Sequence, residues 1–405
     1  MIKRFGLLAL AIFLALSLLS PVPVQAQSGL AVVNSSVQLG FPSHLGFQLS
    51  VESDVNITDI RLYYRVKRLS FAQVTSEVSI EFEPDTRVSA DWVWNMRKTA
   101  GLPPGAVVDF WWAVKDDSGR EIRTKPAQIK FDDLRYDWRS IVEGKVTIYW
   151  YNGDEDFARE LMATAQQALI RLAADTGAKL ETPVSIYIYA SSRDLQGSMI
   201  FPREWSGGVA FTRYGTIAIG IAPGDLGWGK RAMTHELAHL VIHQMTLNPY
   251  NELPNWLDEG LAMYAEGEPE PELAALIKMA AASNRLISVR SLSSPFSALA
   301  GEATLAYAQS YSLVEYLIQN YGQGKMLELL SSFQKGSEYD EVLERVYSFD
   351  MDAFNTLWRD SIGAPLPPEE EKGMPPAVIG VIIVLAAAAI IVIIVIVRRW
   401  LRRWG

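Results

Sequence analysis

The chain has 405 residues, of which 49% are hydrophobic, and its formal net charge is −9 with no cysteine. This length allows a large core, and we expect two folded domains. The negative charge argues against a nucleic-acid partner, and the lack of cysteine excludes disulfides and a lipoprotein signal.

Residues 1–26 have the order of a secretory signal peptide. Lys3 and Arg4 precede an apolar run over residues 7–19, and the segment ends in the small residue Ala26. An uncleaved anchor is the alternative. The apolar run is shorter than the about 20 residues that a spanning helix needs, which favours the signal peptide.

Residues 377–397 are uncharged and rich in Ile and Val, and they are long enough to span a bilayer. Four arginines lie in the tail 398–405, and basic residues prefer the cytoplasmic side. We therefore expect a single-pass cell-membrane protein, held to the lipid bilayer by this helix, with an extracellular N-terminal part. The Pro- and Glu-rich residues 364–376 would form an extended stalk. A buried core helix is the alternative for 377–397.

Residues 28–135 are predicted to form an all-β domain. Short runs rich in Val, Ile and aromatic residues occur at 47–51, 60–66, 78–82, 107–114, 121–124 and 127–131. Residues 116–119, Asp-Asp-Ser-Gly, are a hairpin signal. An immunoglobulin-like sandwich is the natural architecture. His44 is a lone histidine there, expected on a turn or the surface.

Residues 140–363 are predicted to be a second, α+β domain with a helical C-terminal lobe. Strands are expected at 145–151, 184–189, 207–211 and 216–221, and a helix at 154–175 with Asp154 as its N-cap and Gly177 as its stop. Further helices are expected at 230–246, 254–265, 271–283, 302–321, 325–333, 339–347 and 352–362, with Gly322 and Gly363 as terminators.

The helix at 230–246 carries the motif His235-Glu236-Leu237-Ala238-His239. Residues at i and i+4 lie on one helix face, so the two imidazoles could bind one zinc ion. Glu236 would project beside them, where it can reach a water molecule at the ion. The alternative is a histidine pair that lies by chance on the solvent face.

A third ligand is expected on the following helix. Glu259 lies twenty positions after His239, beyond a turn rich in Pro and Asn, and that helix can return antiparallel. Three protein ligands and one open position are typical of catalytic zinc. Asp258 is the rival ligand, but neighbouring helical positions point about 100° apart, so one of the two faces the ion. His243 is interpreted as a packing or outer-sphere group.

These residues resemble the gluzincin metallopeptidases, which include thermolysin and the M1 aminopeptidases, and above all the bacterial peptidase-MA-like subgroup. The resemblance rests on the histidine motif and on Trp256-Leu257-x-Glu259-Gly260, and it covers residues 140–363. It implies that His235, His239 and Glu259 bind one Zn²⁺ per chain and that Glu236 is the general base. Metzincins fit worse, because they need Gly and His where this chain has Ile242 and Met245.

Two further groups match the layout of that family. Gly207, Gly208, Val209 and Ala210 precede a hairpin return, as does the edge strand that pairs with substrate in gluzincins. A plain hairpin is the alternative.

The other group is a tyrosine of the helical lobe. The resemblance implies that Tyr307, with Tyr311 behind it, stabilises the oxyanion. Tyrosines one helical turn apart are otherwise core residues.

The expected function is therefore a membrane-anchored, extracytoplasmic zinc metallopeptidase that acts on peptides or proteins. The Gly-x-Met-x-Asn signature of M1 aminopeptidases is missing, which favours an endopeptidase. The alternatives are a catalytically weak or inactive surface binding or adhesion protein with a peptidase-like fold, and an envelope sensor or assembly factor in which hydrolysis is secondary.

Overall fold

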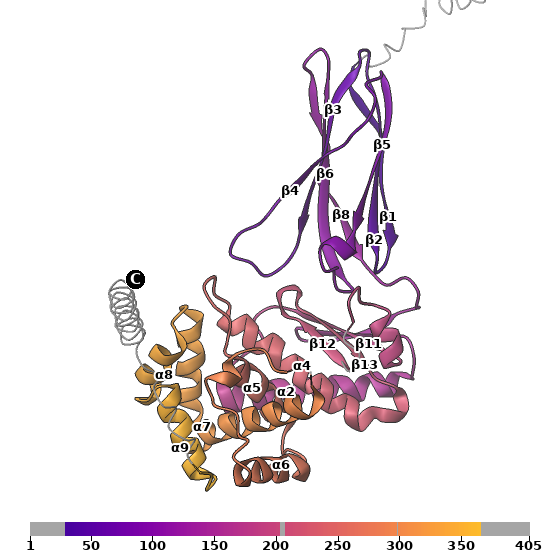
Figure 1. Ribbon diagram of the computed structural model, residues 1–405. Coiled ribbons are helices and arrows are strands. Elements are labelled where there is room, and N and C mark those ends of the chain that lie inside the picture. The colour runs from indigo at the N-terminus through magenta and orange to yellow at the C-terminus, as the bar shows by residue number, and fades with distance from the viewer. Residues whose placement is uncertain (1–28, 203–206, 298, 366–405) are drawn as a thin grey trace, which may run out of the picture.

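The computed structural model describes residues 29–202, 207–297 and 299–365 (Figure 1). The predicted signal peptide, membrane span, basic tail and all but the first two stalk residues lie outside these ranges. Within them, no helix combines the length and apolar character needed to cross a membrane. The chain forms a β-sheet region, then a mixed region, then a helical lobe.

The N-terminal region is built from two antiparallel sheets around one core (Figure 1). The first sheet has the order β1-β2-β5, and the second has β4-β3-β6-β7, with β8 also paired to β6. The strands are β1 (Ala31–Gly40), β2 (His44–Glu52), β3 (Ile57–Val66), β4 (Ser76–Ser79), β5 (Arg87–Asn95), β6 (Ala106–Asp116), β7 (Glu121–Arg123) and β8 (Ala127–Phe131).

Alternation of side chains explains the two faces of these strands. In β2 the buried residues Leu45, Phe47, Leu49 and Val51 alternate with more exposed ones, as expected when one face packs on a core. His44 is exposed and its ring nitrogen lies 2.8 Å from the Ser43 hydroxyl, so it is a surface residue as predicted.

A buried carboxylate anchors the segment that joins the two regions. Asp133 is 0% exposed and accepts hydrogen bonds from Arg135 Nε (2.7 Å) and from the Tyr189 hydroxyl (3.1 Å). Trp138 donates its indole N–H to the Asp133 carbonyl at 2.8 Å. Because the carboxylate is buried and fully paired, it fixes the linker to strand β11 of the sheet that follows.

That sheet has five strands in the order β12-β13-β11-β10-β9. The central pairs β10–β11 and β11–β13 are parallel, and β12 and β9 are antiparallel strands at the two edges. The strands are β9 (Arg139–Glu143), β10 (Val146–Trp150), β11 (Val184–Tyr189), β12 (Gly208–Phe211) and β13 (Thr216–Gly220). The short helix η2 (Thr212–Tyr214) joins β12 to β13.

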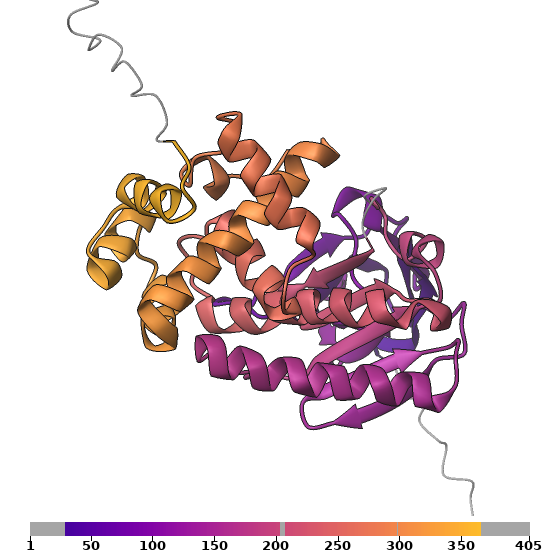
Figure 2. The ribbon, with the colours of Figure 1, turned by 90° about the horizontal axis from the view of Figure 1, so that it is seen from below.

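Two long helices, α2 (Glu155–Thr176) and α4 (Leu226–Thr246), cover one face of this sheet (Figure 2). The caps of α2 are those predicted: the Asp154 side chain accepts from the Phe157 N–H at 2.9 Å, and Gly177 is left-handed with φ 77°. The short helix α3 (Ser192–Gln196) contacts β11 and β13.

The helical lobe follows, and one long helix runs through it. The helices are α5 (Asn255–Glu266), α6 (Pro271–Ala282), α7 (Ala300–Gln334), α8 (Tyr339–Tyr347) and α9 (Met351–Ser361). The two helices predicted at 302–321 and 325–333 are the two parts of α7, which departs from helical geometry at Gly322 (φ 79°, ψ 170°). Gly322 therefore separates the two predicted helices, at the terminating position that the sequence indicated.

Helices α5 and α7 approach closely at Gly260. A Cβ atom at this position would lie 2.4 Å from the Ser310 carbonyl oxygen and 2.6 Å from Val314 Cγ2. Since Gly260 directly follows Glu259, this contact sets how α5 presents that carboxylate.

We expect Gly260→Ala to destabilise the protein by about 1–3 kcal/mol, because the added methyl group must push the two helices apart. Gly324→Ala is the matched control: it also lies in this helix pair, on α7, and its added Cβ meets nothing within 4 Å. Urea unfolding measures both variants. Equal stability of the two variants would show that the close approach is unimportant.

Candidate metal centre

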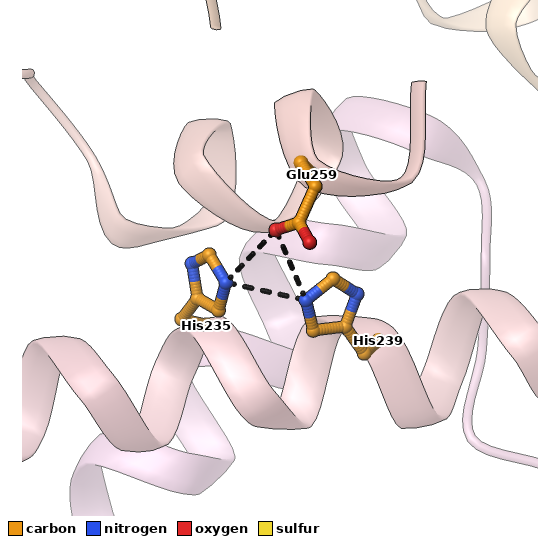
Figure 3. Close-up of side chains that lie close together, drawn as sticks. All are labelled: His235, His239 and Glu259. Carbon is orange, nitrogen blue, oxygen red and sulfur yellow. Dashed lines mark hydrogen bonds and ion pairs between the residues drawn. The ribbon is translucent and has the colours of Figure 1, made fainter. Parts of the chain in front are cut away.

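Helices α4 and α5 bring three side chains together (Figure 3). His235 and His239 lie one turn apart on α4, and their Nε2 atoms are 3.2 Å from each other. Glu259 reaches them from α5, with its Oε2 atom 3.4 Å from His235 Nε2 and 3.5 Å from His239 Nε2. The three donor atoms therefore form a nearly equilateral triangle.

This triangle fits a divalent ion. A tetrahedral zinc ion with bonds of about 2.0–2.1 Å holds its donors about 3.3–3.4 Å apart. Glu259 Oε2 is buried and lacks a hydrogen-bond partner among the described residues, and its distances to the imidazoles are long for hydrogen bonds. A buried carboxylate oxygen without a donor is costly, and a cation would satisfy it. His235, His239 and Glu259 could thus hold one metal ion and leave a fourth position open.

The other ring nitrogen of each histidine is bound by a carboxylate. Glu266 Oε1 lies 2.8 Å from His235 Nδ1, and Asp258 Oδ1 lies 3.0 Å from His239 Nδ1. Such carboxylates fix the tautomer and the ring orientation of metal-binding histidines. Both Nε2 atoms are therefore directed at Glu259.

Asp258 was the alternative metal ligand in the sequence analysis. It contacts His239 Nδ1, on the side of the ring opposite to the triangle of donor atoms. Its second oxygen, Oδ2, lies 3.0 Å from His243 Nε2. His243 is thus an outer-sphere group, one of the two roles that its position suggested.

Glu266 was missed by sequence reasoning, although a signal was present. It lies seven residues, or two helical turns, after Glu259 and therefore on the same face of α5. Its other oxygen, Oε2, lies 3.4 Å from Arg231 Nε, so the carboxylate is itself held in place.

The charges at the site depend on one another. Burial acts to lower the pKa of His235, but the carboxylates of Glu259 and Glu266 raise it to about 9. Burial also opposes charge on His239, yet Asp258 and Glu259 raise the pKa of that imidazole well above its usual value. Burial raises and the two imidazoles lower the pKa of Glu259, which ends at about 2. Without an ion, protons on the histidines balance the carboxylates.

Glu236 lies beside the triangle and against strand β12. The Ala210 backbone N–H donates to its carboxylate, and a Cβ atom on Gly208 would lie 2.9 Å from Glu236 Oε1. Burial, the largest effect, raises the pKa of Glu236, while the neighbouring imidazoles act to lower it. A carboxyl group with a raised pKa is suited to accept and release a proton.

The predicted substrate-binding residues lie at the sheet edge. Gly207 directly precedes β12, and Gly208, Val209 and Ala210 are part of it, all half-buried. A Cβ atom on Gly207 would lie 2.5 Å from the Trp228 ring. Both glycines therefore let β12 approach α4 closely. Pairing of a peptide with this edge stays a prediction.

The two candidate tyrosines differ in their surroundings. The Tyr311 side chain is 8% exposed, and its hydroxyl lies 3.1 Å from Glu315 Oε1. Tyr307 is half-buried, with its ring edge-to-face against Phe296 at 5.3 Å. The hydroxyl of Tyr311 is engaged by Glu315. The role of Tyr307 at an oxyanion, with Tyr311 behind it, stays a prediction.

Metal binding should release protons. At pH 7 both His235 and His239 lie below their raised pKa values and hold protons, so we expect zinc to displace about two protons per site. The apparent zinc affinity should therefore rise as the pH increases from 6 towards 9. Calorimetric titration of the metal-free protein in buffers of different ionisation enthalpy counts the protons. Zinc binding without proton release at pH 7 would contradict this charge balance.

A family model described as the Peptidase MA superfamily matches residues 164–364. A search of curated proteins finds no match.

Among solved structures, the chain is similar to an M1 zinc metallopeptidase from Deinococcus radiodurans, with a TM-score of 0.38 and 14% identity over 84% of this chain and 97% of that one. It is also similar to an aminopeptidase N family protein from Idiomarina loihiensis, with a TM-score of 0.28 and 10% identity over 79% of this chain and 68% of that one. A third similar structure is OgpA from Akkermansia muciniphila, with a TM-score of 0.21 and 10% identity over 27% and 30% of the two chains. On the family match, which spans the histidine motif and Glu259, residues 164–364 of this chain belong to the Peptidase MA superfamily.

Proposed function

We propose that the chain is a zinc metallopeptidase that hydrolyses peptide bonds with Glu236 as its general base. The observation that carries this proposal is the convergence of His235 Nε2, His239 Nε2 and Glu259 Oε2 within 3.2–3.5 Å of one another, with Glu236 beside them. An intact set of this kind argues against an inactive binding protein, because nothing in a purely adhesive role requires it.

The chain would hold one Zn²⁺ through His235, His239 and Glu259. When bound, zinc supplies Lewis acidity, which lowers the pKa of a water molecule and polarises the substrate carbonyl. Glu236 takes a proton from the attacking water and later gives it to the leaving amine. Its raised pKa favours the first transfer, in which the carboxylate accepts the proton.

The remaining groups would position the substrate. The open edge of β12 can pair with an extended peptide through main-chain hydrogen bonds. The Tyr307 hydroxyl would donate to the developing oxyanion, an interaction commonly worth a few kcal/mol, roughly 3. Endopeptidase action is favoured because the aminopeptidase signature is missing from the sequence.

The proposal extends to architecture and location. The two N-terminal sheets would be an immunoglobulin-like sandwich at 28–135, and residues 140–363 would form a gluzincin domain. The signal peptide at 1–26 and the span at 377–397 would place both domains outside the cell membrane. Lack of membrane association of the full-length protein after alkaline extraction would refute the anchor.

We expect Glu236→Gln to keep zinc and to lose hydrolysis by about 10²- to 10⁴-fold, because the amide cannot accept the proton. His239→Ala should lose the metal, since two ligands remain. Metal analysis after dialysis and a casein or peptide assay test both. Equal cleavage by Glu236→Gln and the parent protein would rule out the mechanism, and one zinc per chain in His239→Ala would rule out the ligand set.

Gly208→Ala should lower kcat/KM by about 10- to 100-fold with zinc retained, because the methyl group displaces the Glu236 carboxylate from its place. Gly227→Ala, at the start of α4 with nothing within 4 Å of the added atom, is the matched control. Unchanged kcat/KM in Gly208→Ala would mean that the contact between β12 and Glu236 does not position the base.

A further inference from the structure

A cavity of about 480 Å³ lies where the N-terminal β-region meets the sheet that carries β12. Its walls come from β3, from residues 67–76 between β3 and β4, from Trp94 and the residues 99–102, and from Asp109 of β6. Tyr214 of η2 is the contribution of the second region. The cavity is therefore shared between the two parts of the chain.

The lining of this cavity carries an excess of positive charge. It contains three cations, Arg65, Lys67 and Arg68, and one carboxylate, Asp109, so the balance is 3 − 1 = +2. Arg65 and Lys67 lie 3.2 Å and 3.6 Å from the Asp109 oxygens. In a chain of net charge −9, such a cavity attracts an anionic group.

Arg68 is the cation that is available to a ligand. It is exposed, and no hydrogen bond or ion pair engages its side chain within the described residues. Asp109, by contrast, is 8% exposed and is also bound by Gln128 at 2.9 Å, so its charge is already satisfied. A guanidinium with a free fork binds carboxylates well.

A chain of contacts connects the cavity to the candidate metal centre. The Leu69 N–H donates to the Arg213 carbonyl at 2.7 Å, which joins the residues next to Arg68 to η2. Tyr214 packs against the core of the β-region, and η2 directly follows β12. Glu236 is bound by Ala210 on that strand.

Strand β12 lies at one edge of its sheet. A peptide that paired with this strand and passed Phe211 would approach Tyr214, which lines the cavity. Tyr214 lies four residues after Ala210, a span of at most about 13 Å at about 3.3 Å per residue. A substrate side chain in the cavity would thus be about four residues from the bond beside Glu236.

We propose that this cavity binds an acidic side chain of the peptide substrate, so that the enzyme prefers extended peptides with a glutamate or aspartate about four residues from the cleaved bond. This inference rests on the proposed peptidase function. It assigns to the N-terminal β-region a part in substrate selection, with Arg68 as the specificity-determining residue.

Paired peptides test the proposal with the full-length, zinc-loaded protein. One glutamate is placed at successive positions on either side of the cleaved bond, and each peptide has a glutamine counterpart. At the position that reaches the cavity, kcat/KM should favour glutamate by about three- to tenfold at low salt and less at high salt. In Arg68→Ala this ratio should fall towards one, and in Arg68→Glu it should fall below one.

Arg87→Ala is the matched control, because Arg87 is an arginine of the same region, 84% exposed in its side chain, that does not line the cavity. It should keep the ratio of the parent protein. No preference for glutamate at any position, or an equal loss of preference in Arg87→Ala and Arg68→Ala, would overturn the proposal while leaving the peptidase function intact.

Binding measurements separate this failure from failure of the enzyme. If no peptide is cleaved, the proposed function fails, and fluorescence anisotropy of the labelled glutamate peptide on the same protein still tests the cavity. Tighter binding of the glutamate peptide than of its glutamine counterpart, lost in Arg68→Ala, supports the cavity. Equal binding of the two peptides overturns the proposal. Binding of an acidic oligosaccharide, such as oligogalacturonate, without binding of the glutamate peptide overturns it as well.

Discussion

The candidate site depends on one constraint: two imidazoles and one carboxylate are held close together where they are largely buried. Burial disfavours a charge on each group unless an opposite charge lies nearby. Helix α4 supplies the imidazoles and α5 the carboxylate, so the distance between these helices decides the geometry. Asp258 and Glu266 hold the outer ring nitrogens, which leaves the Nε2 atoms with Glu259 as their nearest anion. A divalent ion in this triangle would replace protons that otherwise keep the charges balanced.

The same helix α4 connects the site to the sheet edge. Glycines 207 and 208 let β12 lie against Trp228 and Glu236, so one contact positions both the proposed general base and the strand that we propose to pair with substrate. Strand β12 continues into η2. This short helix contacts the N-terminal region through the hydrogen bond from Leu69 to the Arg213 carbonyl and through the packing of Tyr214 on the core of that region. The buried Asp133 fixes the linker between the β-region and this sheet.

Much of this arrangement could be predicted from the sequence, because residue spacing and helix-capping residues indicate it locally. The i, i+4 histidines and the caps of α2 depend on short-range geometry. Glu259 was predicted from its place on the following helix and from the resemblance to gluzincins. Strand β1 was missed because its centre is Asn34-Ser35-Ser36, which carries a weak strand signal, and β5 was missed although its buried residues alternate. The role of Asp258 could not be predicted, since it depends on how α5 crosses α4. Gly322, by contrast, interrupts α7 where the sequence predicted the end of a helix. The cavity at the junction arises from tertiary contacts between residues 67–76 and η2, on which no local pattern bears.

X-ray absorption at the zinc edge of the zinc-loaded protein tests the central claim most directly. We predict two imidazole nitrogens and at least one carboxylate oxygen at about 2.0–2.2 Å from the metal, with the carboxylate contribution lost in Glu259→Gln. A spectrum with three imidazoles would place His243 at the metal and would contradict the account. A spectrum left unchanged by Glu259→Gln would contradict it as well.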